Sequence, residues 1–468
     1  MPTKALAEIL REFRFAFTSS PTFDNFMTLV VGWILCTGRH TISRVIQFGR
    51  EAGGKHHSAL YRFFSRAKWD TDALGLVVLK LVMALVPEAV ALTVLVDDTL
   101  CRKSGPHLWG GGMHRDPLGS SYGGAGGRTI KFAFGHNWVT LCVWIALPWN
   151  RERGLAIPVL WRFYRPKKRC PKKEYRKRTE LALEMVNALL DWVPSRSIVV
   201  VTDAEYACMG IVRGLPSRVT FVGPMNMDAA LFALPKPAKG KGRPRKKGSR
   251  LPSPSQLAAD ETVPWKKQTV CIYGREVEIL VKTVVCLWYR VAYTRPVRLV
   301  VTRDPSGRID DRAYFTTDRE LSVATTLNLF SRRWSQEVMH RDVKQHLGLE
   351  DPQNGWWRSP AGDRPEKTAG PQPHVTRGET AVKRTAPIGF LVYALVVLAY
   401  LRAGTPEADV RRARKLAPWY TQKTEPSFAD MLASARRELW ASRLNKHRPL
   451  RAVSRKVTEF FAGYLLAG

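Results

Sequence analysis

The sequence has 468 residues, too many for one compact core, and at roughly 150 residues per domain it predicts two to four domains. Its 74 Lys and Arg against 40 Asp and Glu give a net charge of +34, and a field of that sign attracts polyanions. Nucleic acid is therefore the leading expected partner, and an anionic membrane surface is the alternative. The seven cysteines form no Cys-x-x-Cys pair, which excludes ordinary zinc-site spacing and suits reduced thiols in a cytosol.

The N-terminal region, residues 1–88, has helical patterns throughout. Residues 26–35 predict an apolar core helix, and Thr41 is a suitable N-cap for a helix over 42–48. A second short helix over 58–66 follows a glycine-bearing turn at 49–54. Two short helices about a turn are similar to a helix-turn-helix, so we expect a nucleic-acid-binding domain; a bundle for packing or dimerisation is the alternative. The charged, amphipathic start is not that of a signal peptide.

Residues 89–223 have the pattern of a mixed α/β sheet. Residues 91–96 form an apolar, β-branched strand that ends in Asp97, Asp98 and Thr99, and residues 198–202 form a second strand that ends in Asp203. Further strands are predicted over 138–146, 156–163 and 219–222, with a helix over 174–192. The carboxyl ends of strands in open α/β sheets are where ligands bind, so the aspartates are candidate site residues; an ordinary turn is the alternative.

The remainder of the chain falls into four parts. Residues 224–318 open with a basic Pro/Gly linker over 235–248 and continue as β-rich stretches over 269–272, 276–293 and 297–302. Residues 319–350 include one long predicted helix over 321–347, and residues 351–384 are Pro/Gly-rich and predict a loop. The helical tail, 385–468, begins with an apolar run over 385–401. That run is short for a membrane span and contains a proline, so we expect a buried helix.

One stripe on the predicted helix at 321–347 carries a candidate catalytic group. At roughly 100° per residue, Phe330, Arg333, Glu337 and Lys344 fall on one narrow stripe beside the apolar face. Glu337 lies where core meets solvent, which suits a metal-binding carboxylate. An ordinary salt-bridged face is the alternative, because Arg333 and Glu337 are an i,i+4 pair.

Together these segments resemble the DDE transposases of bacterial insertion sequences, the cut-and-paste group. The resemblance covers about residues 89–350 and rests on three motifs in order: Asp98-Thr99 after an apolar strand, Asp203 after a second strand, and the helical signature Tyr-x2-Arg-x3-Glu-x6-Lys. In this chain Phe330 replaces the signature tyrosine, which removes a hydroxyl contact to DNA and keeps the ring. The resemblance implies an RNase H-like mixed sheet with flanking helices, a β-rich insertion between the second Asp and the Glu, and helical terminal regions.

The family's pattern also implies which side chains act. Its catalytic acid comes immediately before the threonine, which selects Asp98 with Asp203 and Glu337 as metal ligands. Neighbouring residues in a strand point to opposite faces, so Asp97 is then a group that hydrogen-bonds a ligand. Three carboxylates select Mg²⁺, with Mn²⁺ as a substitute, and two ions serve phosphodiester cleavage. Phe330, Arg333 and Lys344 are implied to hold DNA near the scissile bond.

The resemblance also implies binding partners and a cellular location. Double-stranded DNA is expected, as the element's terminal inverted repeats and as target, bound by a homodimer on paired ends in the bacterial cytoplasm at the nucleoid. Two basic runs, 162–178 and 236–250, are predicted DNA contacts, with solvated linkers as the alternative. The second run contributes Arg243, Arg245, Lys246 and Lys247. Trp288 is the candidate for stacking on a flipped base of a DNA hairpin, with core packing as the alternative.

Two rival interpretations share most of these features. An RNase H-like nuclease would keep the carboxylates and cut without rejoining DNA. A domesticated, non-catalytic DNA-binding protein would keep the fold, although the presence of all three acids argues against it. His136 and Trp138 are tempting as a general base and a stacking group, but a packing role at the start of a strand is the preferred interpretation.

Overall fold

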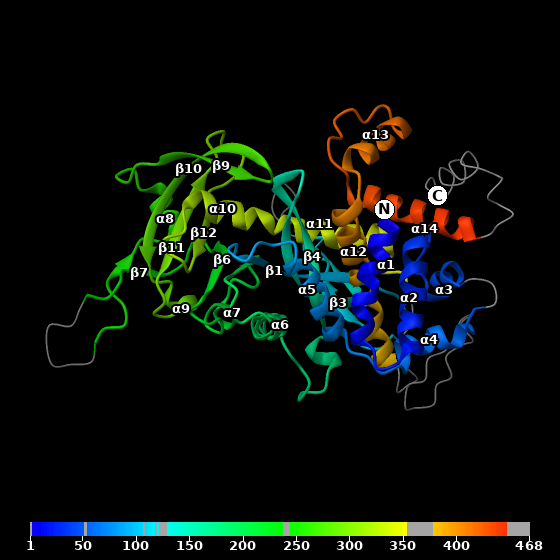
Figure 1. Cartoon of the computed structure of the whole chain (residues 1–468). Coiled ribbons are helices and arrows are strands. Elements are labelled where there is room, and N and C mark those ends of the chain that lie inside the picture. The colour runs from blue at the N-terminus through cyan, green and yellow to red at the C-terminus, as the bar shows by residue number, and fades with distance from the viewer. Residues whose placement is uncertain are drawn as a thin grey trace.

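The computed structural model describes residues 2–50, 54–105, 108–117, 119–120, 129–236, 244–352 and 378–446. Over these ranges the chain is a mixed α/β protein in which helices cover a large sheet (Figure 1). The strands of that sheet are β1 Leu92–Arg102, β2 Gly112–Arg115, β3 Phe132–Leu147, β4 Asn150–Tyr164, β5 Ile198–Thr202, β6 Val219–Met225, β9 Lys266–Ile272, β10 Arg275–Cys286, β11 Val297–Arg303 and β12 Arg312–Thr316. A separate pair consists of β7 Leu231–Phe232 and β8 Arg250–Leu251.

The helices gather mainly at one end of the molecule, where both terminal regions lie side by side (Figure 1). The N-terminal group is α1 Pro2–Glu12, η1 Phe13–Ala16, α2 Ser20–Leu35, α3 Ile42–Gly49, α4 His57–Ser65 and α5 Thr71–Met83. The C-terminal group is α12 Gly378–Ala403, α13 Pro406–Leu416 and α14 Phe428–Lys446. The others are η2 Lys167–Arg169, α6 Arg178–Trp192, α7 Met209–Val212, α8 Pro254–Ala259, α9 Tyr289–Ala292, α10 Val323–Arg332 and α11 Trp334–Leu347.

The first half of the sheet has the topology of an RNase H-like domain. Strands β4, β3 and β1 are antiparallel neighbours, and β1, β5 and β6 continue the sheet as parallel neighbours. The prediction that the first strand ends at Asp98 is wrong, because β1 runs on to Arg102. The long β3 strand explains this: it pairs with β1 as far as Arg102 opposite Gly135, so the backbone stays extended past both aspartates.

Apart from the short β7–β8 pair, the β-rich segment does not form a sheet of its own. Strand β12 pairs with β6, and β11, β10 and β9 follow in order, so these strands extend the sheet that begins with β4 and β3. The predicted strand over 276–293 is too long, because β10 ends at Cys286 and α9 follows. Whether the predicted ranges fold as independent domains stays a prediction.

The N-terminal helices begin where the sequence predicts, and two glycines set their packing. The Thr41 side chain caps α3 by accepting a hydrogen bond from the Arg44 backbone N–H. Helices α2 and α3 approach closely because a Cβ on Gly32 would lie 2.2 Å from the Val45 carbonyl oxygen, and one on Gly49 would lie 2.4 Å from the Thr28 carbonyl oxygen. Only glycine fits at both positions, so this crossing depends on the two residues.

Helix α12 passes through the interior of the helical end. It packs against α1, α4, α5, α11, α14 and β4, and its residues from Ile388 to Tyr400 are almost fully buried. By length and composition it is the one helix among the described residues that could cross a membrane, but 78% of its apolar window is buried inside the protein. The expected buried helix is confirmed. The predicted loop over 351–384 is too long at its end, since α12 begins at Gly378; residues 353–377 lie outside the described ranges.

Candidate active site

Asp97 and Asp203 lie on one face of the sheet. Strands β1 and β5 are parallel, with Val96 opposite Thr202. Asp97 and Asp203 each follow directly after one of these two residues, so they lie at matching positions at the end of the pairing. Matching positions on neighbouring strands point to the same face of a sheet. On the other side of β1, Asp97 is paired with Thr140 of β3, which therefore shares this face.

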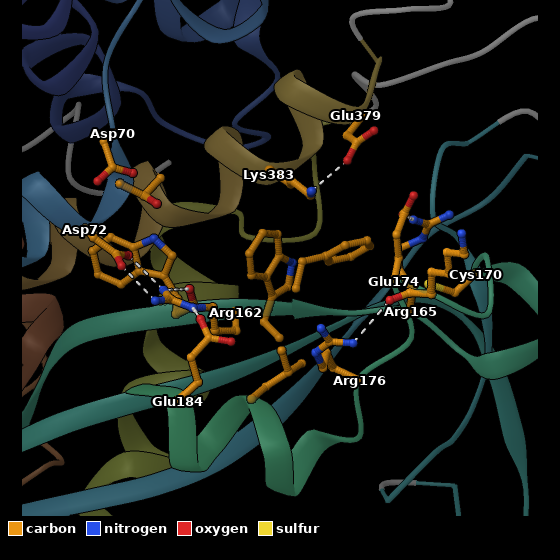
Figure 2. A pocket seen from close by; sticks show the side chains of 16 residues that line it. Asp70, Asp72, Arg162, Arg165, Cys170, Glu174, Arg176, Glu184, Glu379 and Lys383 are labelled. Carbon is orange, nitrogen blue, oxygen red and sulfur yellow. Dashed lines mark hydrogen bonds and ion pairs between the residues drawn. The ribbon is translucent and has the colours of Figure 1, made fainter. Parts of the chain in front are cut away.

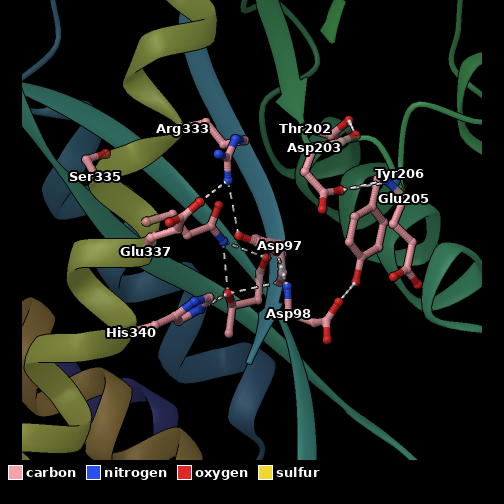
Figure 3. Close-up of polar contacts among 12 residues, drawn as sticks. Asp97, Asp98, Thr202, Asp203, Glu205, Tyr206, Arg333, Ser335, Glu337 and His340 are labelled. Carbon is pink, nitrogen blue, oxygen red and sulfur yellow. Dashed lines mark hydrogen bonds and ion pairs between the residues drawn. The ribbon is translucent and has the colours of Figure 1, made fainter. Parts of the chain in front are cut away.

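Helix α11 lies beside β1 and places Glu337 on the side of Asp97 and Arg333 (Figure 3). The Gln336 amide donates hydrogen bonds to the Thr140 carbonyl oxygen at 3.0 Å and to Thr140 Oγ1 at 2.9 Å. His340 Nε2 lies 2.9 Å from the same hydroxyl, and burial lowers the pKa of His340 to about 3, so its ring is neutral. These contacts hold α11 against β3 on both sides of Glu337.

Arg333 links the carboxylates. Its Nη1 lies 2.5 Å from Glu337 Oε1 and 3.7 Å from Asp97 Oδ2. Burial lowers the pKa of the Arg333 guanidinium, but the charges of Glu337, Asp97 and Asp203 more than offset this and the pKa is raised. Arg333 occupies the junction between α10 and α11, so the predicted single helix is two helices that meet at this residue.

The two aspartates are costly to ionise in this setting. Burial raises the pKa of Asp97 well above its ordinary value, the charges of Asp203 and Asp98 raise it further, and Arg333 opposes the shift. Burial also raises the pKa of Asp203, while the Tyr206 backbone N–H, which donates to Asp203 Oδ1, lowers it. A cation at this place therefore stabilises the ionised forms.

Asp98 points to the opposite face. Its carboxylate accepts hydrogen bonds from Asn137 Nδ2 at 2.6 Å, Tyr206 Oη at 2.8 Å and Arg178 Nη1 at 3.0 Å. The prediction that Asp98 acts with Asp203 and Glu337 stays a prediction: Arg333 joins Asp97 to Glu337, whereas the charge of Asp98 helps to raise the pKa of Asp203. Neighbouring side chains of β1 alternate between its two faces, so Asp97 and Asp98 cannot both point toward α11.

Of the residues that surround Asp98, only Arg178 was predicted from the sequence, as part of the first basic run. Tyr206 is the main residue that was missed, because its backbone N–H bonds Asp203 and its hydroxyl bonds Asp98. Burial and the charge of Asp98 raise the pKa of Tyr206 well above its ordinary value, so the hydroxyl stays protonated and donates. Arg178 pairs with both Asp98 and Glu205. These contacts of Tyr206 and Arg178 tie the loop after β5 to β1. The only sign of them in the sequence is that Tyr206 follows Asp203 by three residues.

The carboxylates of Asp97, Asp203 and Glu337 are the kind of ligand that a hard divalent cation prefers, but in this structure they are not close enough together to form a complete metal site. Among the described residues, no three His, Cys, Asp or Glu side chains are grouped closely enough to bind a metal ion. Asp97 and Glu337 both form ion pairs with the Arg333 guanidinium, and the charge of Asp203 also raises its pKa. Carboxylate oxygens are the ligands that Mg²⁺ takes in proteins. Asp97, Asp203 and Glu337 would hold such an ion.

The other residues of the helical signature are near this site but are engaged within the protein. Lys344 Nζ donates to the Leu100 carbonyl oxygen at 2.7 Å, which ties α11 to β1. The Phe330 ring packs on Tyr314 at 4.7 Å between centroids, and the Arg333 guanidinium lies 5.7 Å from its centre. Their predicted contacts with DNA stay predictions.

Trp288 and His136 both have packing partners. Trp288 is 6% exposed, packs edge-on against Phe315, and lines a cavity of about 450 Å³ that also includes Ala204, next to Asp203. His136 lies 3.0 Å from the Trp109 carbonyl oxygen, and burial lowers its pKa to about 3. Trp138 packs against Phe163. A packing role for His136 and Trp138 agrees with the structure, and base stacking by Trp288 stays a prediction.

The first basic run is divided between ion pairs and an exposed loop. Arg162 lies between Asp72 and Glu184, and Arg165 pairs with Glu174, at a cavity of about 670 Å³ (Figure 2). The loop from β4 to α6 carries the exposed cations Lys167, Lys168, Arg169, Lys172, Lys173, Arg176 and Lys177. The loop is therefore the part of this run that is open to a polyanion.

The second basic run is described only in part. Arg243 lies outside the described residues, and Arg245 is exposed. Lys246 donates to the Tyr293 hydroxyl, and the Lys247 ammonium lies 4.0 Å from the centre of the Phe232 ring. Lys246 and Lys247 thus pack on aromatic side chains of the β-rich region.

An RNase H-like sheet with three acids on one face defines a class of nucleases that act on phosphodiester bonds. The model of the family described as DDE superfamily endonuclease matches residues 12–275, more than half of the chain, and the chain belongs to this family. The match includes Asp97, Asp98 and Asp203 and ends before Glu337. No curated protein matches the chain.

Proposed function

We propose that the protein is a transposase that binds the ends of a mobile element, cleaves DNA there and joins the ends to target DNA. The observation that carries this proposal is the gathering of Asp97, Asp203 and Glu337 around Arg333 on one face of the sheet. Family membership supports endonuclease activity on DNA; strand transfer, terminal repeats and a homodimer on paired ends belong to the proposal. An endonuclease that does not rejoin DNA is the alternative outcome.

The chain's own residues set the geometry of cleavage. Asp97 and Asp203 are held by neighbouring strands, and Glu337 is held by the contacts of Gln336 and His340 with Thr140. One or two divalent ions, when bound, would activate the attacking oxygen and neutralise the charge that develops on the phosphate. Arg333 would bind a phosphate oxygen beside the scissile bond, because a guanidinium forms paired hydrogen bonds with phosphate.

The first test replaces Glu337 with Gln, which keeps the size and removes the charge. We expect cleavage of the element's own ends with Mg²⁺ to fall about 10²–10³-fold, because a group that stabilises developing charge contributes on that scale. Gel analysis of nicked and rejoined products measures both steps. Glu350→Gln is the matched control, since Glu350 accepts from the Arg102 backbone N–H at the far end of β1. Equal cleavage by wild type and Glu337→Gln would exclude the proposed site.

The exposed loop between β4 and α6 is the proposed DNA-tracking surface. Replacing Lys167, Lys168, Lys172 and Lys173 with Gln should flatten the dependence of DNA affinity on salt. Each of them that contacts a phosphate should lower the slope of log affinity against log salt by about 0.9. Fluorescence anisotropy over a series of salt concentrations measures the slope. The control removes the same charge from α13 with Arg411, Arg412, Arg414 and Lys415 replaced by Gln; an equal change in both variants contradicts a specific role for the loop.

A further inference from the structure

Among the described residues, Arg333 is the cation whose pKa is raised by all three carboxylates of the candidate site. Its Nη1 contacts Glu337 at 2.5 Å and lies 3.7 Å from Asp97, and its pKa responds to the charge of Asp203 as well. Only 17% of its side chain is exposed, so water screens these interactions poorly. Arginine cannot lose its proton in a protein, so this positive charge is permanent.

The position of Arg333 is the position that a metal ion would need. Three carboxylates with restricted access to water repel one another, and a counter-ion is required to keep them ionised together. A guanidinium supplies this charge at the distances seen here, and a divalent ion would supply it more strongly. Two cations this close together repel each other, so an ion that takes the place of Nη1 between Asp97 and Glu337 displaces the guanidinium.

We propose that Arg333 is the counter-ion of the metal-free site and that it exchanges partners during loading: it releases Asp97 and Glu337 to the incoming divalent ion and moves to a phosphate of DNA. This inference rests on the proposed function, because it takes the three carboxylates as the metal ligands. Arg333 and the divalent ion compete for the carboxylates, and metal binding is coupled to DNA binding; neither effect follows from the presence of the carboxylates.

Three features of Arg333 make the exchange feasible. A single nitrogen, Nη1, makes both contacts with the acids, so few bonds hold the guanidinium in place. Its Nε is buried and has no hydrogen-bond partner among the described residues, so one donor of the guanidinium is unused in the present position. The residue also stands at the junction of α10 and α11, and its guanidinium already leans over the Phe330 ring.

The exchange predicts that DNA and metal ions bind cooperatively. A phosphate that attracts Arg333 leaves the carboxylates without their counter-ion, which favours a divalent ion. By linkage, an ion in the site releases Arg333 and raises the affinity for DNA by the same factor. In the absence of DNA the protein should bind the divalent ion more weakly, because the ion must first displace Arg333 from the carboxylates.

The test measures Mn²⁺ binding to the full chain by the electron paramagnetic resonance signal of free Mn²⁺, without any cleavage reaction. We expect Arg333→Gln to bind Mn²⁺ about tenfold more tightly than wild type, a factor usual for coupled sites. Arg341→Gln, which removes the same charge from an exposed position of the same helix, should leave the affinity unchanged. Arg333→Lys should bind Mn²⁺ about as weakly as wild type, because lysine keeps a positive charge that competes with the ion.

Asp97→Asn separates failure of this inference from failure of the proposed function. If Asp97→Asn leaves Mn²⁺ binding intact, the ion is held elsewhere and the proposed site is wrong. If Asp97→Asn abolishes binding while Arg333→Gln binds no better than wild type, the site stands and the counter-ion role is wrong. Should Arg333→Gln be less stable, its rise in melting temperature with Mn²⁺ should exceed that of wild type, because tighter binding stabilises the folded chain more.

A second arm tests the destination of Arg333. Mn²⁺ binding is repeated with a short DNA duplex of random sequence, and the binding of the duplex alone is subtracted. We expect the duplex to raise the Mn²⁺ affinity of wild type several-fold and to leave that of Arg333→Gln unchanged. An equal gain in both proteins, or no gain in wild type, would contradict the transfer of Arg333 to phosphate.

Discussion

Replacement of Asp97 with Asn is expected to reduce DNA cleavage about 10³-fold, whereas Asp98→Asn is expected to reduce it less than about tenfold. Charge stabilisation through a metal ion is worth several kcal/mol, and each 1.36 kcal/mol is a factor of ten in rate. Asp97 shares a face with Asp203 and Glu337, and Asp98 does not. Single-turnover cleavage of labelled element ends, at saturating protein, measures the chemical step.

The smaller effect of Asp98→Asn has its own physical basis. The amide oxygen still accepts the Tyr206 hydroxyl, but the charge that pairs with Arg178 is lost. The loop that carries Asp203 should then be held less firmly, so the loss should be recovered in part by more Mg²⁺. A loss in Asp98→Asn as large as in Asp97→Asn, and insensitive to Mg²⁺, would reverse the assignment.

Replacement of Asp409 with Ala is expected to lower the free energy of unfolding by about 3–5 kcal/mol, the usual cost of leaving one buried charge without its partner. Asp409 is 5% exposed and accepts from Tyr400 Oη at 2.9 Å and from Arg437 Nη2 at 2.5 Å. It therefore joins α13 to both α12 and α14. Burial lowers the pKa of Arg437 and Asp409 opposes that shift, so the guanidinium depends on this carboxylate.

Denaturant titration followed by circular dichroism measures this loss of stability. Glu379→Ala provides the control, because Glu379 forms an exposed i,i+4 pair with Lys383 and its removal should cost less than about 0.5 kcal/mol. Asp409→Asn should fall between the two, as it keeps an acceptor for Tyr400. A change below about 1 kcal/mol in Asp409→Ala would mean that Arg437 finds another partner or reaches water.

Much of the architecture could be predicted where local pattern and tertiary structure agree. The run of β-branched residues before Asp203 is a strand because each side chain fits a buried sheet, and α3 begins after Thr41 because that side chain caps it. The buried helix α12 was predicted from its apolar length and its proline. Element ends were less accurate: β1 continues for four residues past Asp98 because β3 offers backbone partners there.

The candidate site likewise has residues that local sequence pattern could identify and one choice that it could not settle. Asp203 and Glu337 were identified from strand and helix patterns together with a family resemblance, and the structure places them on one face with Asp97. The choice of Asp98 over Asp97 followed the family's spacing before threonine, and the ion pair of Arg333 with Asp97 makes Asp97 the candidate that we propose instead. That choice depends on the register between β1 and β5, two strands that lie 96 residues apart in sequence between Arg102 and Ile198.

Composition and local pattern were enough to predict the charge, the apolar strands and helices, and the types of residue that could bind a metal ion and DNA. These properties depend on composition and on short-range periodicity, which act within a few turns or one strand. Three-dimensional folding was needed to show that the β-rich segment extends the main sheet and that Arg333 joins Asp97 to Glu337. Those facts arise from pairing between distant segments, whose register is set by the packing of the whole sheet against its helices.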